Sequence, residues 1–457
     1  MPHLSPSLTG AISASTERPF RSTTSSSVRR RPEYPGANSH VPDDHFLLHL
    51  TDRPVRDLLR DGTIRLLSCR WLLEDAEAAL PRSSASGLPV LRRNQKMPEE
   101  AFLPPEEAAR VFDKGKRQVL VLSYGWLLAT EPDPRGERLA LIRRFLATLP
   151  DAAECGFFMD QVCLPQPPRT KEEDEVFFKG LGSMGKLYAS VTGTTVVQIK
   201  SVPARPAEME GRLSIRKLAE DVEQEQLQAA LSAHGDVRWC KLQRGATGSA
   251  EVQYATHAEA VAAMQAQTAA ARLPSIGDRQ MSRGLTHRRL LTERALSKAA
   301  LPGMQALLKQ AMIFEAYNSR RYEERGWCCF EEGLAQVVVA HLAEQASKGR
   351  IPKKHSAAEE KRPKLIALED DGTAQPHEAE HTPNTLLEEL QARIEDAKFT
   401  GEKDRPKVNK QVDEFMWLIS RGVEQAVEQR MAQTAGLHWL SFGTRRKTHP
   451  LPPAERD

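Results

Sequence analysis

The alternation of strands and helices between residues 119 and 199 constrains the fold more than any other feature of the chain. Residues 119–122 (Val-Leu-Val-Leu) are a continuous apolar run, which is typical of a strand buried on both faces of a parallel sheet. The spacing of apolar residues predicts the elements that follow: a helix over 137–149, a strand over 157–160, a helix over 171–188 and a strand over 196–199. This order predicts a parallel α/β sheet.

A different pattern interrupts this alternation after residue 200. Residues 211–270 predict strand, helix, strand, strand and helix, at 213–218, 223–231, 237–242, 249–254 and 257–267. Helical periodicity then returns over 304–317 and 325–341. We therefore expect an α/β domain in two parts, residues 46–200 and 301–345, with a separate α+β module inserted at residues 204–300.

The remaining segments are expected to carry less tertiary structure. Residues 1–45 are rich in Ser, Thr and Arg, and residues 346–381 are dense in charge, so both predict disorder. Thr382-Pro383 is typical of a helix start. Apolar spacing predicts a helical hairpin over 382–435, a candidate for self-association, followed by a tail over 436–457.

Composition excludes several classes of protein. A net charge of +3 over 457 residues is too small for a global nucleic-acid or membrane field, and nothing indicates recognition of a DNA sequence. No apolar run approaches the roughly 20 residues of a membrane span, so no membrane partner is expected. The six cysteines form no C-x-x-C pair and no metal site, which favours a reducing compartment. We expect a cytoplasmic protein, with organelle import through residues 1–40 as the alternative.

Four motifs together carry a resemblance to a known family. They are Leu122-Ser123-Tyr124-Gly125-Trp126 at the end of the first strand, M-D-Q-V-C-L-P-Q over 159–166 at the end of the second, Met184 through Tyr188-Ala189 on the next helix, and G-W-C-C-F-E over 326–331. In this order they resemble the fungal heterokaryon-incompatibility (HET) domain and the related Toll/interleukin-1 receptor (TIR) domain. The resemblance covers residues 115–200 and 305–345, and it implies a flavodoxin-like parallel sheet.

The TIR resemblance also implies a reaction and the residues that carry it. Active TIR domains hydrolyse the nicotinamide–ribose bond of NAD, so NAD is a candidate substrate, and their key glutamate corresponds to Glu331. Ligands of open α/β sheets bind beyond the carboxyl ends of the strands, where two of the motifs lie. The other candidates are Asp160 beside Glu331, Ser123, Tyr124 and Trp126 around the nicotinamide, and Arg169 for a phosphate. Alternatively, Glu331 is a solvated edge residue and the domain only assembles with partners.

The inserted module resembles an RNA-recognition motif (RRM) over its core at 211–270, which implies a ferredoxin-like α+β fold. Such motifs stack bases on aromatic residues of the open sheet face. Here Ser214, Ser249 and Glu251 occupy the three aromatic positions, which weakens that expectation. Trp239, Lys241 and Arg216 are predicted to share the open face instead, where they could hold one base or contact a protein partner.

Three functions follow from these observations. The first is a modular signalling protein whose TIR/HET-like domain and insert bind protein partners or a second copy of the chain. The second is an NAD hydrolase that acts through Glu331. The third is an RNA-binding protein that acts through the insert.

Overall fold

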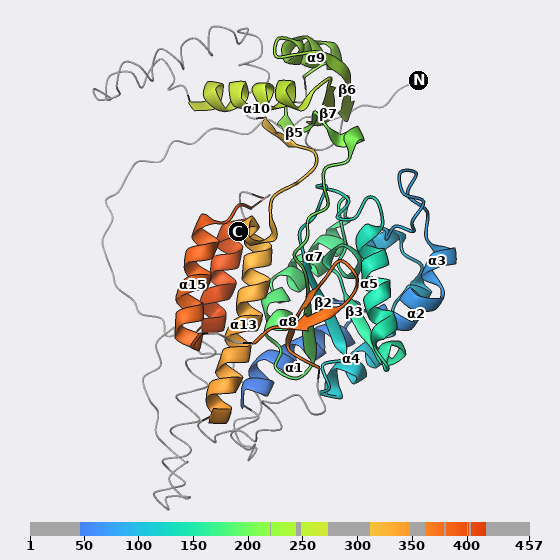
Figure 1. Cartoon of the computed structure of the whole chain (residues 1–457), viewed down its shortest axis with the longest axis vertical. Helices are drawn as coiled ribbons and strands as arrows, with labels where there is room; N and C mark the ends of the chain where they lie inside the picture. The colour runs from blue at the N-terminus through green and yellow to red at the C-terminus, as the bar shows by residue number, and fades with distance from the viewer. Residues whose placement is uncertain are drawn as a thin grey trace, which may run out of the picture. The chain divides into compact units, whose positions relative to one another are not determined.

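The computed structural model describes residues 46–219, 221–243, 248–272, 311–347, 362–378, 381–399, 401 and 404–416. The predicted tails at 1–45 and 436–457, the charged segment at 348–361 and the end of the insert at 273–310 lie outside the described residues. The described chain is mixed α/β with two separate sheets (Figure 1).

The larger sheet has six strands, and its four central strands run parallel. In spatial order the strands are β1 (Leu67–Ser68), β3 (Gly156–Phe158), β2 (Val119–Tyr124), β4 (Thr194–Ile199), β9 (Leu365–Leu368) and β10 (Ala374–Pro376). The edge strands β1 and β10 pair antiparallel to their neighbours. The predicted parallel α/β sheet is therefore confirmed, with its three predicted strands adjacent at the centre.

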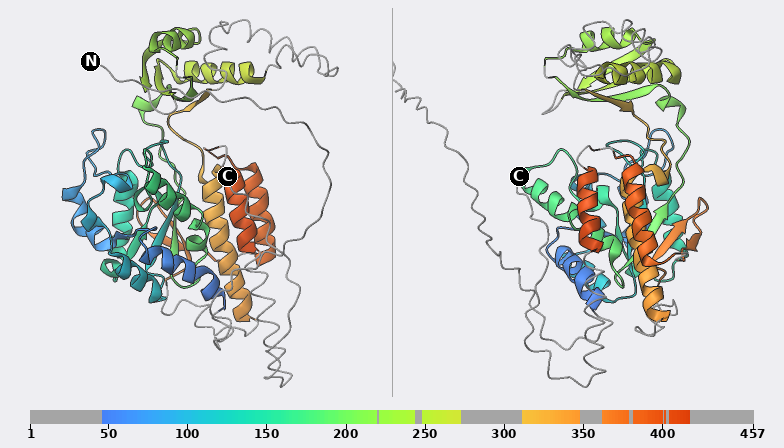
Figure 2. Two further views of the ribbon diagram at one scale, coloured as in Figure 1. Left: turned by 180° about the vertical axis from the view of Figure 1, so that it is seen from behind. Right: turned by 90° about the vertical axis from the view of Figure 1, so that its left-hand side faces the viewer.

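Strand β2 is the centre of this sheet because all six of its residues are buried. The chain leaves β2 for β3 on one side and then crosses back to β4 on the other. Since crossovers between parallel strands are right-handed, this reversal puts α5 (Glu137–Thr148) on one face and α8 (Met184–Ala189) on the other. Helix α13 (Gly326–Ser347) joins α8, where Gly185 lies against Phe330. Figure 2 shows these helices from two further directions.

The remaining helices of this domain cover its edges. They are α1 (Phe46–Arg60), α2 (Cys69–Glu74), α3 (Ala76–Ala79), α4 (Pro105–Asp113), α6 (Asp160–Cys163) and α7 (Lys171–Leu181). Helix α1 is followed by a turn at Gly62, whose φ of 73° favours glycine. The single helix predicted over 171–188 is wrong in one respect, because the chain breaks at Gly182-Ser183 and forms α7 and α8 separately.

The predicted disordered linker is wrong over residues 362–378. Leu365-Ile366-Ala367-Leu368 forms β9, parallel to β4, and three of these four residues are buried. The backbone of Lys364 accepts from Val196 N at 2.7 Å, and its buried ammonium donates to Thr194 Oγ1, also at 2.7 Å. The charged residues around this four-residue apolar run led to the prediction of a linker, although the run forms the strand between β4 and the edge strand β10.

The second sheet is antiparallel and belongs to the insert. Its strands, in spatial order, are β6 (Val237–Gln243), β7 (Gly248–Tyr254), β5 (Arg212–Leu218) and β8 (Met312–Glu315). Helix α9 (Gln224–Ser232) follows β5, and α10 (His257–Arg272) follows β7. The five predicted elements of the insert are all present. The helix predicted over 304–317 is wrong at 312–315, because Ile313 and Phe314 pair with Ile215 and Ser214 of β5.

The C-terminal helices pack on the larger domain. Helix α15 (Pro383–Asp396) and a helix over 404–416 begin where the hairpin was predicted. Leu390 packs directly on Gly333 of α13, and Gln411 Oε1 accepts from Gly185 N at 3.1 Å. The apolar side chains that suggested self-association, Leu386, Leu390, Ile394, Val408, Val412 and Phe415, are buried within this chain.

We expect Leu390→Ala to destabilise the larger domain. Leu390 is 1% exposed, and its removal leaves a cavity beside Gly333 that costs about 2–5 kcal/mol of unfolding free energy. Urea unfolding measures this loss, with the exposed Glu388→Ala as the matched control on the same helix. A variant as stable as the wild type would show that α15 does not pack on α13.

Candidate active site

A chain of buried hydrogen bonds lies at the carboxyl end of the parallel sheet. Ser123 Oγ, at the end of β2, donates to Glu331 Oε2 of α13 at 2.6 Å. The hydroxyl oxygen of Tyr322 lies 2.6 Å from the same Ser123 oxygen and accepts from Gln198 Nε2 of β4 at 3.1 Å. Glu331 therefore contacts the end of the first predicted strand directly.

Local structure explains why these groups meet. Ser123 and Gln198 are paired residues of β2 and β4, so their positions along the sheet are fixed by register. Tyr322 lies on a short 3₁₀ helix (Tyr322–Glu324) directly before α13, and Glu331 lies on the second turn of α13. Sequence reasoning missed Tyr322 and Gln198. Tyr322 belongs to none of the four motifs, and Gln198 was predicted only as a residue of the strand over 196–199.

The hydrogen-bond chain can run in two directions, depending on the proton of Glu331. If the carboxylate is ionised, Ser123 donates to it and Tyr322 donates to Ser123. If Glu331 is protonated, it can donate to Ser123, which donates to Tyr322, whose proton then turns to the Cys328 carbonyl 3.4 Å away. Both states satisfy the hydroxyl groups, so the site can accept or release a proton at Glu331 without rearrangement.

Burial determines the charge state of Glu331. Glu331 is only 6% exposed, and this burial raises the pKa of its carboxyl well above the ordinary value. The hydrogen bond from Ser123 opposes the rise, and the negative charge of Asp160 adds to it. Burial therefore favours the neutral acid over the carboxylate at Glu331.

Asp160 forms the second half of the site, at the end of β3. Its carboxylate accepts from Tyr124 Oη at 3.1 Å, from Trp126 Nε1 at 3.0 Å and from the Gln161 backbone N–H at 2.8 Å. Burial raises the pKa of Asp160 to about 6, although these hydrogen bonds lower it. Asp160 and Trp126 keep some exposed surface, so the site meets solvent on their side.

Two buried arginines shape the loop that follows β2. Arg325 donates to the Trp126 carbonyl at 2.7 Å, and its guanidinium lies flat against Gly125, where a Cβ would clash with it. Arg138 donates to the Gly125 carbonyl from α5. Gly125 is therefore required by the close approach of Arg325, and the loop that presents Trp126 is held from two sides.

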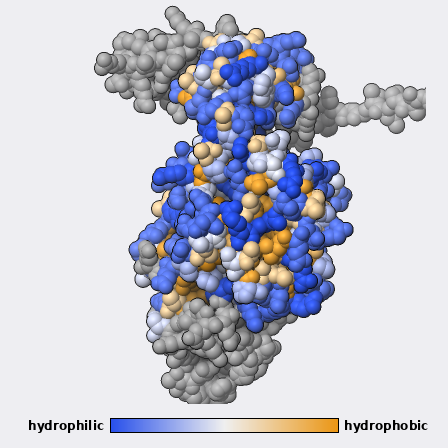
Figure 3. Space-filling view, turned by 45° about the vertical axis from the view of Figure 1, so that its right-hand side comes forward, coloured by the Kyte–Doolittle hydropathy of each residue, from blue (hydrophilic) through white to orange (hydrophobic). Residues whose placement is uncertain are grey.

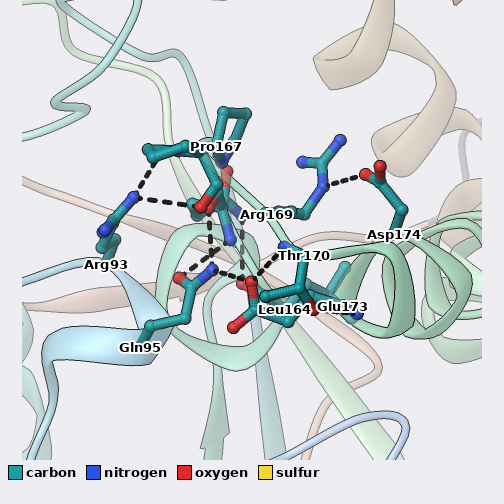
Figure 4. A network of polar contacts seen from close by, with 10 residues as sticks. Arg93, Gln95, Leu164, Pro167, Arg169, Thr170, Glu173 and Asp174 are labelled. Atoms are coloured by element: carbon teal, nitrogen blue, oxygen red, sulfur yellow. Dashed lines mark hydrogen bonds and ion pairs between the residues drawn. The ribbon is translucent and has the colours of Figure 1, made fainter. Parts of the chain in front are cut away.

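Arg169 contacts α7 rather than this network. Its guanidinium donates to Asp174 at 2.6 Å and lies 3.9 Å from the centre of the Phe177 ring, both on α7. Figure 4 shows Arg169 paired with Asp174 beside the loop that follows β3. A phosphate would have to compete with Asp174 for this side chain.

The three candidates on the insert share the open face of its sheet. Lys241 Nζ lies 5.1 Å from the centre of the Trp239 ring, and Arg216 lies on the neighbouring part of the same face on β5. Sequence reasoning missed Phe314 on β8, whose ring lies 5.2 Å from the Arg216 guanidinium. Arg212 reaches the same face, lies 5.1 Å from the Trp239 ring and pairs with Glu251. The negative charge of Glu251 is therefore neutralised locally.

Neither a metal site nor a membrane-spanning helix is found among the described residues. That part of the chain holds no cluster of three or more His, Cys, Asp or Glu side chains placed to bind a metal. No helix within it has both the length and the apolar character needed to cross a membrane. All six cysteines are buried and free of disulfides.

Comparison of the chain with models of known families, with curated proteins and with solved structures gives no match. The functional assignment therefore depends on the geometry of the site.

We expect Asp160 to make stability depend on pH. Its pKa is raised from 3.8 to about 6 in the folded state, so folding is favoured below pH 4 and this contribution is lost as the pH rises through 6. The loss amounts to about 3 kcal/mol at most. Urea unfolding between pH 4.5 and 7.5 should show the wild type losing stability relative to Asp160→Asn over this range.

The exposed Asp57→Asn is the control for this measurement. Its stability should stay parallel to that of the wild type across the range. If Asp160→Asn also stays parallel, the environment described for Asp160 is wrong.

Proposed function

We propose that the larger domain is the enzymatic part of a modular signalling protein and hydrolyses the N-glycosidic bond of NAD through Glu331. The observation that carries this proposal is the buried hydrogen bond between Glu331 and Ser123 at the carboxyl end of β2, with Asp160 at the end of the adjacent β3 near enough for its charge to raise the pKa of Glu331. This edge is where open α/β sheets bind ligands, and the strand order reverses there. The TIR-like motifs place the same residues in these roles.

The proposed reaction breaks the bond between C1′ of the ribose and the nicotinamide nitrogen. Nicotinamide leaves with the bonding electron pair, so its ring becomes neutral, and positive charge develops on C1′ and the ring oxygen. A water oxygen then bonds to C1′ and releases one proton, which gives ADP-ribose, nicotinamide and H⁺. A carboxylate beside C1′ stabilises the positive charge in the transition state.

The raised pKa of Glu331 fits a cationic substrate. Burial favours the neutral carboxyl in the free site, and the positive nicotinamide ring of NAD favours the ionised form on binding. Ser123 can donate to the ionised carboxylate and Tyr322 to Ser123, so the hydrogen bonds of the site suit the ionised form without a change in side-chain position. Trp126, which is partly exposed and hydrogen-bonded to Asp160, supplies aromatic surface for the nicotinamide, whereas Tyr124 is 5% exposed and holds Asp160 from within the core.

We expect purified full-length protein to release nicotinamide from NAD, and Glu331→Gln to reduce this rate at least about 100-fold. Glutamine keeps the shape and the contact with Ser123 but cannot ionise. Ser123→Ala should retain some activity, because it removes a hydrogen bond and leaves the carboxylate. Chromatographic measurement of nicotinamide distinguishes these variants.

Glu323→Gln is the matched control, since Glu323 is exposed and lies just before α13. Equal rates for Glu323→Gln and Glu331→Gln would exclude Glu331 as the catalytic group. If concentrated wild-type protein releases no nicotinamide, the hydrolase proposal fails and the domain is better regarded as an assembly module.

We also propose that the insert binds single-stranded nucleic acid, and the specific observation is the pair of aromatic residues on its open face. The strand order β6-β7-β5-β8, with a helix after β5 and another after β7, is that of a β-α-β-β-α-β fold and supports the RRM-like reading. Trp239 and Phe314 offer two stacking surfaces, and Arg212, Arg216 and Lys241 surround them with positive charge.

We expect Trp239→Ala and Phe314→Ala each to weaken binding of a fluorescent single-stranded oligouridine by about 5- to 150-fold, the range for one stacked base. Fluorescence anisotropy at fixed salt measures the affinity. Phe178→Ala is the control, because Phe178 is exposed on α7 outside the insert. Unchanged affinity in the Trp239→Ala, Phe314→Ala double variant would exclude this face as the binding surface.

A further inference from the structure

A cleft lies on the larger domain between the end of α3 and the segment before α4. Its volume is about 720 Å³, which is within the range of about 300–1,000 Å³ that small-molecule sites occupy. Its lining residues are Ala79, Leu80, Pro81, Arg92, Gln95, Lys96, Met97 and Pro98. None of them belongs to the Glu331 site, so the cleft is a separate feature of the domain.

The lining of this cleft has an apolar part and a cationic part. Leu80 and Met97 are buried and form an apolar wall with Pro81 and Pro98. The side chains of Arg92 and Lys96 are exposed, and neither side chain has a hydrogen-bond or ion-pair partner among the described residues. The lining contains no carboxylate. The site therefore offers two cations to an anion and apolar surface to the rest of the same ligand.

The wall that carries Lys96 is held in place by the loop that follows β3. Gln95 donates from Nε2 to the Gln166 carbonyl at 2.8 Å and accepts from Gln166 N at 3.1 Å (Figure 4). The neighbouring Asn94 donates to the Val162 carbonyl at 2.7 Å, and Arg93 donates to the Pro167 carbonyl at 2.7 Å. These bonds preorganise the cleft, so little ordering is needed when a ligand binds.

We propose that this cleft binds a small organic anion, one that carries a phosphate or carboxylate group next to an apolar ring or chain. The anionic group contacts Arg92 and Lys96, and the apolar part lies against Leu80 and Met97. Bare inorganic anions lack the second contact. Neutral aromatic compounds lack the first. This site is independent of the proposed NAD hydrolysis, because it requires neither Glu331 nor Asp160.

Calorimetric titration of the full chain with phenyl phosphate tests the proposal. We expect submillimolar binding, which the Arg92→Gln, Lys96→Gln double variant weakens at least about tenfold, since it removes both cations. The matched control is Arg70→Gln, Arg110→Gln, which removes two exposed arginines on α2 and α4 and should leave the affinity unchanged. Circular dichroism establishes that both double variants fold.

Inorganic phosphate and phenol separate the two parts of the ligand. Each should bind at least about tenfold more weakly than phenyl phosphate. Absence of phenyl phosphate binding at millimolar concentration, equal affinity in both double variants, or equal affinity for inorganic phosphate would each overturn the proposal. Because nicotinamide release is measured separately, failure here leaves the hydrolase proposal unaffected.

Discussion

Ser123 and Glu331 are 208 residues apart in the sequence, and the hydrogen bond between them connects the two parts of the α/β domain. It joins the central strand to the helix that follows the insert, and it lies among groups that are all buried. An unpaired carboxyl at this depth would cost free energy, so the site requires α13 to dock in one register. The same contact that completes the candidate site therefore also fixes how the interrupted domain closes.

Glu332, the next residue, shows how differently a neighbouring carboxylate can be used. It pairs with Lys200 of the β4 end at 2.8 Å and with Arg393 of α15 at 2.5 Å. Although burial raises it, the two cations hold the pKa of Glu332 below its ordinary value. Glu332 thus remains charged and ties α15 to the domain. Among the described residues, Glu331 forms no ion pair with a Lys or Arg side chain, so of the two glutamates it is the one that can exchange a proton.

The sequence predicted the parallel core well because its signals are local. Residues 119–122 are uniformly apolar, and the strand-end positions of Ser123 and Asp160 follow from where those runs stop. The misses involve long-range pairing. Strand β9 and strand β8 each have four residues, too few for a reliable period, and each is defined by a partner strand far away in the sequence. Phe314 was missed for the same reason, since its face is set by β5.

The last strand of the insert, β8, is followed closely in the sequence by residues of the candidate site. Only seven residues separate Phe314 of β8 from Tyr322. Arg325 pins this segment by donating to the carbonyls of Asn318 and Arg320, and it also donates to the Trp126 carbonyl. Asn318 N donates in turn to the Leu127 carbonyl at 2.7 Å. These bonds tie residues 318–325, which follow β8 in the sequence, to the loop that carries Trp126.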